Sequence, residues 1–215
     1  MIKINKIFVA FCFLTLISFM MGCNNDQSQD PMAQDVDTKG VQVVQTDMPK
    51  AGEKIAVLTT NMGEIKVRLF PDLVPETYKN FAFHVEEGNY NGTTFHRVIE
   101  DFMIQGGDIE GLDGIGGYSY KGKGTTIAEE FDPALTHVRG ALSMAKTTFP
   151  ATTGSQFFIV QAEAGTSWLD NQHSVFGQVF EGMEIVDEIA GVTVGANDKP
   201  VTPVYLESVK IEDYQ

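Results

Sequence analysis

The stretch "FHRVIEDFMIQGGD", residues 95–108, carries the features that decide the fold. It places one cation, Arg97, and one amide, Gln105, beside the apolar side chains of Phe102 and Met103. A hydrolase needs a nucleophile with a base within reach, and this stretch holds neither serine nor cysteine. We therefore predict a site whose chemistry breaks no covalent bond.

The same stretch belongs to a series of short segments that we predict to be β-strands. Residues 54–60 and 64–70 flank the turn "NMG", which is typical of a hairpin, and Ile65, Val67 and Leu69 alternate with polar side chains. Gly-rich turns separate the segments that follow. The other strands are expected at 93–99, 102–107, 140–145, 156–161, 174–180 and 205–214.

Two helices are expected among these strands. Pro71 and Pro75 precede the first helix, which ends near Gly88. The second covers 183–190. The apolar face of the first helix, spaced at i, i+3, i+4 and i+7, is expected to consist of Tyr78, Phe81, Ala82 and Val85. Eight strands and two helices predict a mainly β domain over residues 53–215, a closed antiparallel β-barrel capped by two α-helices.

Composition narrows the class of partner. The 215 residues carry a formal net charge of −14, and binding to nucleic acid needs a surplus of Lys and Arg against phosphate. We therefore expect no nucleic-acid partner. A hydrophobic content of 43% is ordinary for a globular protein with a core.

Residues 1–22 have the pattern of a secretory signal. Lys3 and Lys6 precede an apolar run of about 15 residues, which is short for a membrane-spanning helix. Gly22, Cys23 and a polar continuation resemble a bacterial lipoprotein cleavage site. The resemblance implies that Cys23 is lipidated and anchors an extracytoplasmic protein to a membrane, on the periplasmic or cell-surface side. The alternative is an uncleaved anchor helix with an incidental cysteine.

The segment 23–52 is predicted to be the lipidated cysteine followed by a flexible acidic and polar tether, because it is poor in large apolar residues. The two cysteines of the chain are Cys12 and Cys23. The domain after the tether therefore has no disulfide, thiolate nucleophile or cysteine metal site.

Three other patterns in the sequence do not predict a functional site. "GYSYKGKG", residues 117–124, lacks the Ser or Thr that a phosphate-binding loop places after its lysine. The adjacent Glu129 and Glu130 cannot flank one bond from a strand, and we interpret them as solvated charge. No two histidines stand at metal-ligand spacing, so no metal is expected. The histidines are His84, His96, His137 and His173.

Three motifs in order resemble the cyclophilin family of peptidyl-prolyl isomerases. They are the opening stretch, "GALSMAKTTFPATTGSQFFIV" at 140–160 and "WLDNQHSVFGQV" at 168–179. The resemblance covers about residues 54–212. It implies a monomeric peptidyl-prolyl cis-trans isomerase without a cofactor that assists the folding of extracytoplasmic proteins, with proline-containing segments of those proteins as partners.

The resemblance also assigns roles to individual residues. Arg97 is implied to be catalytic, and Gln105 to hold the substrate carbonyl and steady Arg97. The apolar floor for the proline ring is implied to be Phe102, Met103, Phe158 and Leu169, with His173 at its edge. The groove for the preceding residues is implied to contain Ala145, Lys146 and Gln156, with Trp168 at the rim.

Physical reasoning agrees with the role implied for Arg97. Rotation about an X-Pro bond faces a barrier of ~18–20 kcal/mol and needs no nucleophile. The twisted bond loses its resonance and its nitrogen becomes basic. A fixed guanidinium that donates to this nitrogen therefore stabilises the twisted form more than the planar one, which is what raises a rate.

Two departures from the animal-type pattern concern the groove. Lys146 stands where Asn is common, and the loop "KTTFPATT" is one residue longer, as in the bacterial branch of the family. Trp168 is by contrast the animal-type residue, which goes with binding of the cyclic peptide cyclosporin. We therefore expect cyclosporin to be a ligand.

Two alternative functions remain at this stage. One is a binding module that grips proline-containing segments without turnover, which the presence of Arg97 disfavours. The other is a tethered barrel that carries a small ligand, which needs a large apolar interior. An isomerisation assay on a short peptide separates the three.

Overall fold

The computed structural model describes residues 44–149 and 151–215. The predicted signal segment, Cys23 and most of the tether therefore lie outside the described residues. Within the described part, no helix is both long enough and apolar enough to cross a bilayer.

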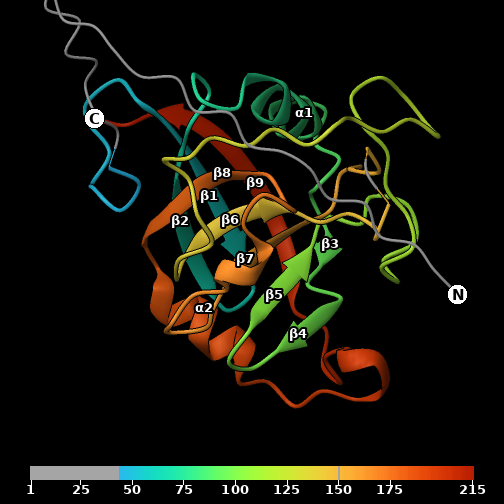
Figure 1. Cartoon of the computed structure of the whole chain (residues 1–215). Helices are drawn as coiled ribbons and strands as arrows, with labels where there is room; N and C mark the ends of the chain where they lie inside the picture. The colour runs from blue at the N-terminus through green and yellow to red at the C-terminus, as the bar shows by residue number, and fades with distance from the viewer. Residues whose placement is uncertain (1–43, 150) are drawn as a thin grey trace, which may run out of the picture. The chain divides into compact units, whose positions relative to one another are not determined.

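One antiparallel sheet of nine strands forms the body of the domain (Figure 1). Its strands run in the spatial order β3-β9-β1-β2-β8-β6-β7-β5-β4, and the sheet curls into a half-barrel. The strands are β1 (Lys54–Thr60), β2 (Gly63–Leu69), β3 (Thr93–Thr94), β4 (Arg97–Ile99), β5 (Met103–Gly106), β6 (Ala141–Met144), β7 (Phe157–Val160), β8 (Val175–Glu181) and β9 (Tyr205–Asp213).

The predicted hairpin is confirmed, with β1 and β2 paired across a tight turn. Thr60 stabilises that turn, because its hydroxyl oxygen accepts hydrogen bonds from the backbone N–H groups of Met62 and Gly63 at 3.0 Å each. Ile65 and Val67 point into the core, as the alternation of apolar and polar residues predicts. The other edge of β1 pairs with β9, so the first and last strands are neighbours in the sheet.

The prediction of a closed, eight-stranded barrel is wrong. Residues 93–99 form two short strands, of which β3 pairs with β9 and β4 pairs with β5. Between them the chain turns at Phe95 and His96, whose side chains are buried. Because this segment leaves one neighbouring strand before it joins the other, no continuous strand closes the ladder. The sheet stays open between β3 and β4.

Both predicted helices are present, as α1 (Pro75–Glu86) and α2 (Met183–Ala190). The predicted face of α1 is only partly right, because Phe81 is buried whereas Tyr78, Ala82 and Val85 are half-buried. Polar side chains take the remaining buried positions, and those of Asn80 and His84 have hydrogen-bond partners there. The buried residues of α1 are Thr77, Asn80, Phe81 and His84.

An aromatic cluster forms the core between α1 and the sheet. The ring of Phe81 lies 5.3 Å from Tyr90, 5.8 Å from Phe157 and 5.1 Å from Phe176, measured between centroids. The Tyr90 hydroxyl donates to the carbonyl oxygen of Ser155 at 2.8 Å, which satisfies its buried oxygen. Burial of each ring stabilises the fold by roughly 1.5–3 kcal/mol.

Packing of the domain begins before residue 53, the boundary predicted from composition. The Gln45 amide donates to the Thr136 carbonyl at 2.9 Å and to the Gln178 side-chain oxygen at 3.0 Å. Its own oxygen accepts from the Thr136 N–H at 2.8 Å. Arg68 donates to the carbonyl of Val44 at 3.0 Å. These contacts involve backbone and amide groups, which composition does not reveal.

Candidate active site

A cavity of about 240 Å³ opens beside the short strands β4, β5 and β7. All nine residues around it belong to the eleven that the sequence predicts for the pocket and its groove. They are Arg97, Phe102, Met103, Gln105, Ala145, Lys146, Phe158, Leu169 and His173. The structure therefore gathers residues from four distant segments around one space, which we call the Arg97 pocket.

Backbone pairing sets the relative positions of the side chains on the strand side of this pocket. Arg97 on β4 lies opposite Gln105 on β5, and Gln105 lies opposite Phe158 on β7. Side chains at opposed positions share one face of a sheet. A cation, an amide and an aromatic ring are thereby aligned across three strands.

Arg97 is only partly buried, although it lies on a strand with apolar neighbours. Its side chain is 41% exposed, and its Nε lies 3.5 Å from the Oδ2 of Asp198. Gln105 donates to the side-chain oxygen of Gln156 at 2.9 Å, so in the described residues it bonds to Gln156 rather than steadying Arg97. The guanidinium thus lies at the mouth of the pocket.

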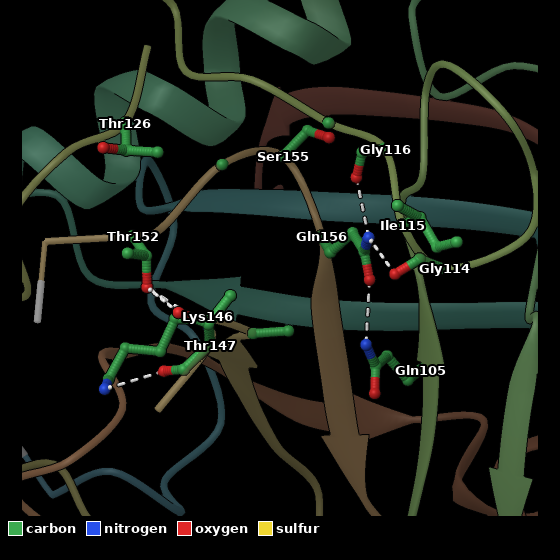
Figure 2. Close-up of a pocket in the computed structure, with 13 residues that line it drawn as sticks. Gln105, Gly114, Ile115, Gly116, Thr126, Lys146, Thr147, Thr152, Ser155 and Gln156 are labelled. Carbon is green, nitrogen blue, oxygen red and sulfur yellow. Dashed lines mark hydrogen bonds between the residues drawn. The ribbon is translucent and has the colours of Figure 1, made fainter. Parts of the chain in front are cut away.

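A second cavity of about 330 Å³ adjoins the Arg97 pocket and shares Gln105, Ala145 and Lys146 with it. Figure 2 shows Gln156 in the middle of this groove, between Gln105 and the glycine-rich loop. The Gln156 amide donates to the carbonyls of Gly114 at 3.0 Å and Gly116 at 2.7 Å. Gln156 therefore joins the strand side of the groove to its loop side.

The loop over residues 109–117, here the Asp108 loop, is held by one buried carboxylate. Asp108 Oδ1 accepts from the N–H groups of Glu110 and Gly111, and Oδ2 accepts from those of Asp113, Gly114 and Gly116. Burial raises the pKa of this carboxyl, but the backbone donors outweigh burial and lower the pKa to about 2. Asp108 thus remains ionised and fixes the two carbonyls that Gln156 binds.

The loop that begins at Lys146 is held by a second carboxylate, that of Glu129. Both oxygens of Glu129 lie 3.0 Å from the N–H of Ala151, and Oε1 lies 3.5 Å from the Lys146 ammonium. The side chains of Lys146 and Glu129 are only 12% and 11% exposed. Lys146 is therefore an ion-paired side chain at the boundary of both cavities.

The interpretation of Glu129 and Glu130 as solvated charge is wrong. Glu129 is largely buried against Lys146. Glu130 accepts from the N–H groups of Glu76 at 3.2 Å and Thr77 at 2.6 Å, which are in the first turn of α1. A carboxylate at a helix N-terminus accepts hydrogen bonds from free N–H groups and interacts favourably with the positive end of the helix dipole. Both acids bind segments distant in sequence, which no local pattern announces.

The floor of the Arg97 pocket is backed by a buried polar chain. The ring of Phe158 stacks on His137 at 5.8 Å. His137 Nδ1 lies 2.8 Å from Asp170 Oδ1, and its Nε2 lies 2.9 Å from the Ser143 hydroxyl. Burial lowers the pKa of His137, against the opposing effect of Asp170. The chain fixes the plane on which Phe158 rests.

The rim of the pocket carries the tryptophan that the sequence predicts there. Trp168 is in the short helical turn η1 (Ser167–Leu169) and is 59% exposed. Its ring lies 6.1 Å from that of Phe102, tilted by 31°. Leu169, the next residue, lines the pocket.

No group of three metal-ligating side chains occurs among the described residues.

The family of this chain follows from its match over most of the domain. Residues 55–211 match the family described as cyclophilin type peptidyl-prolyl cis-trans isomerase/CLD. The chain belongs to the cyclophilin family. The Arg97 pocket and the Gln156 groove are therefore features of a cyclophilin domain.

Named relatives and solved structures agree with this assignment. Putative peptidyl-prolyl cis-trans isomerases are 40% identical to this chain. That of Staphylococcus epidermidis matches over 78% of this chain and 100% of its own length, and that of Staphylococcus aureus over 75% and 93%. A Cryptosporidium parvum cyclophilin type peptidyl-prolyl cis-trans isomerase, crystallised in the presence of the dipeptide Ala-Pro, is similar with a TM-score of 0.69 and 32% identity. The match covers 74% of this chain and 99% of that one.

Sequence reasoning missed the groups that hold the site of this cyclophilin in place. Asp108 ends the opening motif, but its role as an acceptor for five N–H groups has no sequence pattern. Asp198 lies outside all three motifs. His137 was considered only as a metal ligand. A glycine-rich segment directly after a buried-looking aspartate is the one signal that could have pointed to the Asp108 loop.

Proposed function

We propose that this cyclophilin catalyses rotation about X-Pro bonds in extracytoplasmic proteins and so assists their folding, while a lipid on Cys23 tethers it to a membrane. The observation that carries the catalytic part is the Arg97 pocket. A permanently charged guanidinium borders a cavity of about 240 Å³ whose floor is formed by Phe102, Met103 and Phe158.

The pocket supports rotation through differential binding. Phe102, Met103 and Phe158 form an apolar surface that holds the ring of proline while the chain before it turns. Gln105 lies near enough to the same space to donate to a substrate carbonyl. Arg97 then donates a hydrogen bond to the prolyl nitrogen, which is basic only in the twisted state. That contact stabilises the transition state more than the ground state.

The magnitude required is compatible with this arrangement. An acceleration of about 10⁵-fold corresponds to about 7 kcal/mol of transition-state stabilisation. One charge-assisted hydrogen bond that is shielded by the bound substrate supplies about half of that value, because removal of a comparable donor costs ~3–4 kcal/mol in other enzymes. Immobilisation of the ring on the apolar floor contributes the remainder.

The catalytic proposal is tested by Arg97→Ala, with Arg97→Lys as a second variant that keeps the charge. We expect Arg97→Ala to lower kcat/KM for a short proline peptide by about 100-fold or more, since half of ~7 kcal/mol is lost. The melting temperature should stay unchanged, because Arg97 is half exposed. Retention of activity within about threefold would refute the electrostatic role.

The same assay separates catalysis from the alternative of a binding module. A binding module holds proline peptides with measurable affinity but gives the uncatalysed rate of cis-trans exchange at all enzyme concentrations. The wild-type domain should instead raise the exchange rate in proportion to its concentration. The contacts of Arg97 favour catalysis, because simple retention of an apolar ring requires no cation at its edge.

The proposed tether rests on the sequence around Cys23 and on the polar composition of the segment that follows. Cys23→Ser tests it, because a serine cannot receive a thioether-linked lipid. We expect the variant to move from the membrane fraction to the soluble fraction, or to remain unprocessed. A processed variant that still sediments with membranes would show that Cys23 is not the anchor.

Cyclosporin is a proposed ligand of the same site. Trp168 is exposed at the rim and offers an indole N–H on a broad apolar surface, a combination suited to an N-methylated cyclic peptide. Trp168→Phe keeps the surface and removes the donor, so we expect inhibition by cyclosporin to weaken roughly tenfold. Turnover of a short peptide should hardly change. Equal inhibition of the two forms would contradict the role of the indole.

A further inference from the structure

Asp198 contacts Arg97 from a part of the chain about one hundred residues away. Its carboxylate oxygen Oδ2 lies 3.5 Å from the Arg97 Nε. Asp198 ends the short turn η2 (Ala196–Asp198), which lies beside β4 (Figure 1). Among residues 44–149 and 151–215, no other acid lies within ion-pair distance of Arg97.

The loop around η2 is built so that it presents this carboxylate. Asn197 and Asp198 adopt φ values of 61° and 57°, in the left-handed region that costs free energy for residues with a Cβ. Hydrogen bonds across the base of the loop hold the conformation. The N–H of Gly195 donates to the carbonyl of Lys199 at 2.8 Å, and that of Val201 donates to Thr193 at 2.9 Å.

Arg97 and Asp198 also share a space with Gln105. The three residues line a cavity of about 570 Å³, which shares Arg97 and Gln105 with the Arg97 pocket. The Nε atom joins the guanidinium to the aliphatic part of the arginine side chain. A carboxylate beside Nε therefore lies next to the inner edge of the guanidinium. The two terminal nitrogens are then left for a ligand in the pocket.

We propose that Asp198 is a positioning residue for this isomerase. It holds the guanidinium of Arg97 by its Nε edge so that the terminal nitrogens face the prolyl nitrogen. This inference rests on the catalytic role proposed for Arg97. It adds a residue that lies outside the sequence motifs and acts through Arg97 rather than on the substrate.

A nearby acid also has an opposing effect, because it offsets part of the positive charge that stabilises the twisted bond. Distance decides which effect is larger. The side chains of Arg97 and Asp198 are 41% and 46% exposed, so water screens the charge of the acid toward both Arg97 and the substrate, but the contact with Arg97 at 3.5 Å is shorter than any path from Asp198 to a prolyl nitrogen beyond the guanidinium. Loss of the contact would leave the guanidinium free to turn away from the substrate. Small displacements of a catalytic group lower rates severely. Removal of the acid should therefore lower activity.

The experiment uses Asp198→Asn, which keeps the shape of the side chain and removes its charge. We expect kcat to fall by about threefold to tenfold while KM changes by less than about twofold, because Arg97 acts on the transition state. In the Arg97→Ala background, the same substitution should change kcat/KM by less than about 1.5-fold. The matched control is Asp213→Asn, an exposed aspartate on β9 that pairs with Lys54, which should leave kcat unchanged.

A spectroscopic readout separates positioning from a structural effect. The heteronuclear NOE of the Arg97 Nε–H group, assigned by its loss in Arg97→Ala, should fall in Asp198→Asn as the side chain becomes mobile. An equal loss of kcat/KM in both backgrounds would show a structural role and overturn the inference, as would an unchanged or increased kcat. Lack of activity in the wild type would instead overturn the proposed function, and the inference with it.

Discussion

The two sides of the substrate groove are held by different kinds of bonds. On one side, β4, β5 and β7 carry Arg97, Gln105 and Phe158, and the main-chain ladder fixes their relative positions. On the other side, two irregular loops are held by side-chain hydrogen bonds, and one carboxylate contributes to each of them. Asp108 gathers five backbone N–H groups, and Glu129 holds one N–H group and Lys146.

The two sides of the groove should therefore respond differently to substitution of their side chains. A ladder tolerates changes of side chain because its bonds are between backbones. A loop held by one carboxylate loses many bonds together when that group is changed. We therefore expect substitutions at the two carboxylates to cost more stability than conservative changes on the strand side.

The largest effect is expected from Asp108→Asn. The amide keeps one acceptor oxygen but turns an NH₂ group toward backbone donors, which leaves buried N–H groups unpaired. We expect a loss of about 2–3 kcal/mol in the free energy of unfolding, together with a lower affinity of the groove for peptides. Denaturant melts and peptide titration measure the two effects. The matched control, Asp101→Asn, changes an exposed aspartate and should stay within about 0.5 kcal/mol.

The pH dependence of stability tests the same residue. The pKa of Asp108 is lowered from 3.8 to about 2 in the folded protein. A group with a depressed pKa stabilises the fold above its unfolded value, and this contribution is lost as the pH falls through the folded value. About 2 kcal/mol should therefore disappear between about pH 4 and pH 2 in the wild type and not in Asp108→Asn. Parallel acid profiles for the two proteins would contradict this account.

A smaller effect is expected from Glu129→Gln. The substitution removes the charge that pairs with Lys146 and weakens the bonds to the N–H of Ala151. We expect a loss of about 1–2 kcal/mol, because hydrogen bonds to a charged group contribute that much. Hydrogen exchange of the Ala151 amide should accelerate, and that of β7 amides should not. Glu207→Gln, on the exposed face of β9, serves as the control.

The smallest effect is expected on the strand side, from Met103→Leu. Met103 is buried on β5, which has ladder partners on both sides. A change that conserves volume should cost less than about 1 kcal/mol, since backbone pairing is unaffected. A loss as large as that of Asp108→Asn would break the comparison between the two sides.

The sequence predicted the strand side of the groove better than the loop side for a physical reason. Alternation in 64–70 reflects the period of two that the pleat imposes on a strand, and the apolar run at 156–161 is typical of a strand that is buried on both faces. The carboxylates of Asp108 and Glu129 bind backbone N–H groups, which every residue except proline possesses. Such contacts have no preferred partner residue and no period, so they leave no periodic pattern to recognise.

Two errors in the predicted fold have a similar origin. Residues 93–99 look like one strand because no turn residue interrupts the sequence at Phe95 and His96. The segment nevertheless changes its pairing partner there, from β9 to β5, and both partners are distant in the sequence or follow later. On α1, His84 and Asn80 are buried because Tyr118 and Gly154 offer carbonyl oxygens. Hydrophobic spacing cannot register a polar side chain that is buried with its partner.

The pairing of β1 with β9 bears on when the domain can fold. β1 begins at Lys54, near the start of the domain, and its partner β9 ends at Asp213, two residues before the end of the chain. A sheet that needs both strands cannot be completed before β9 has been synthesised. Contacts this distant in sequence also slow folding. Completion of the sheet therefore waits for the last strand of the domain.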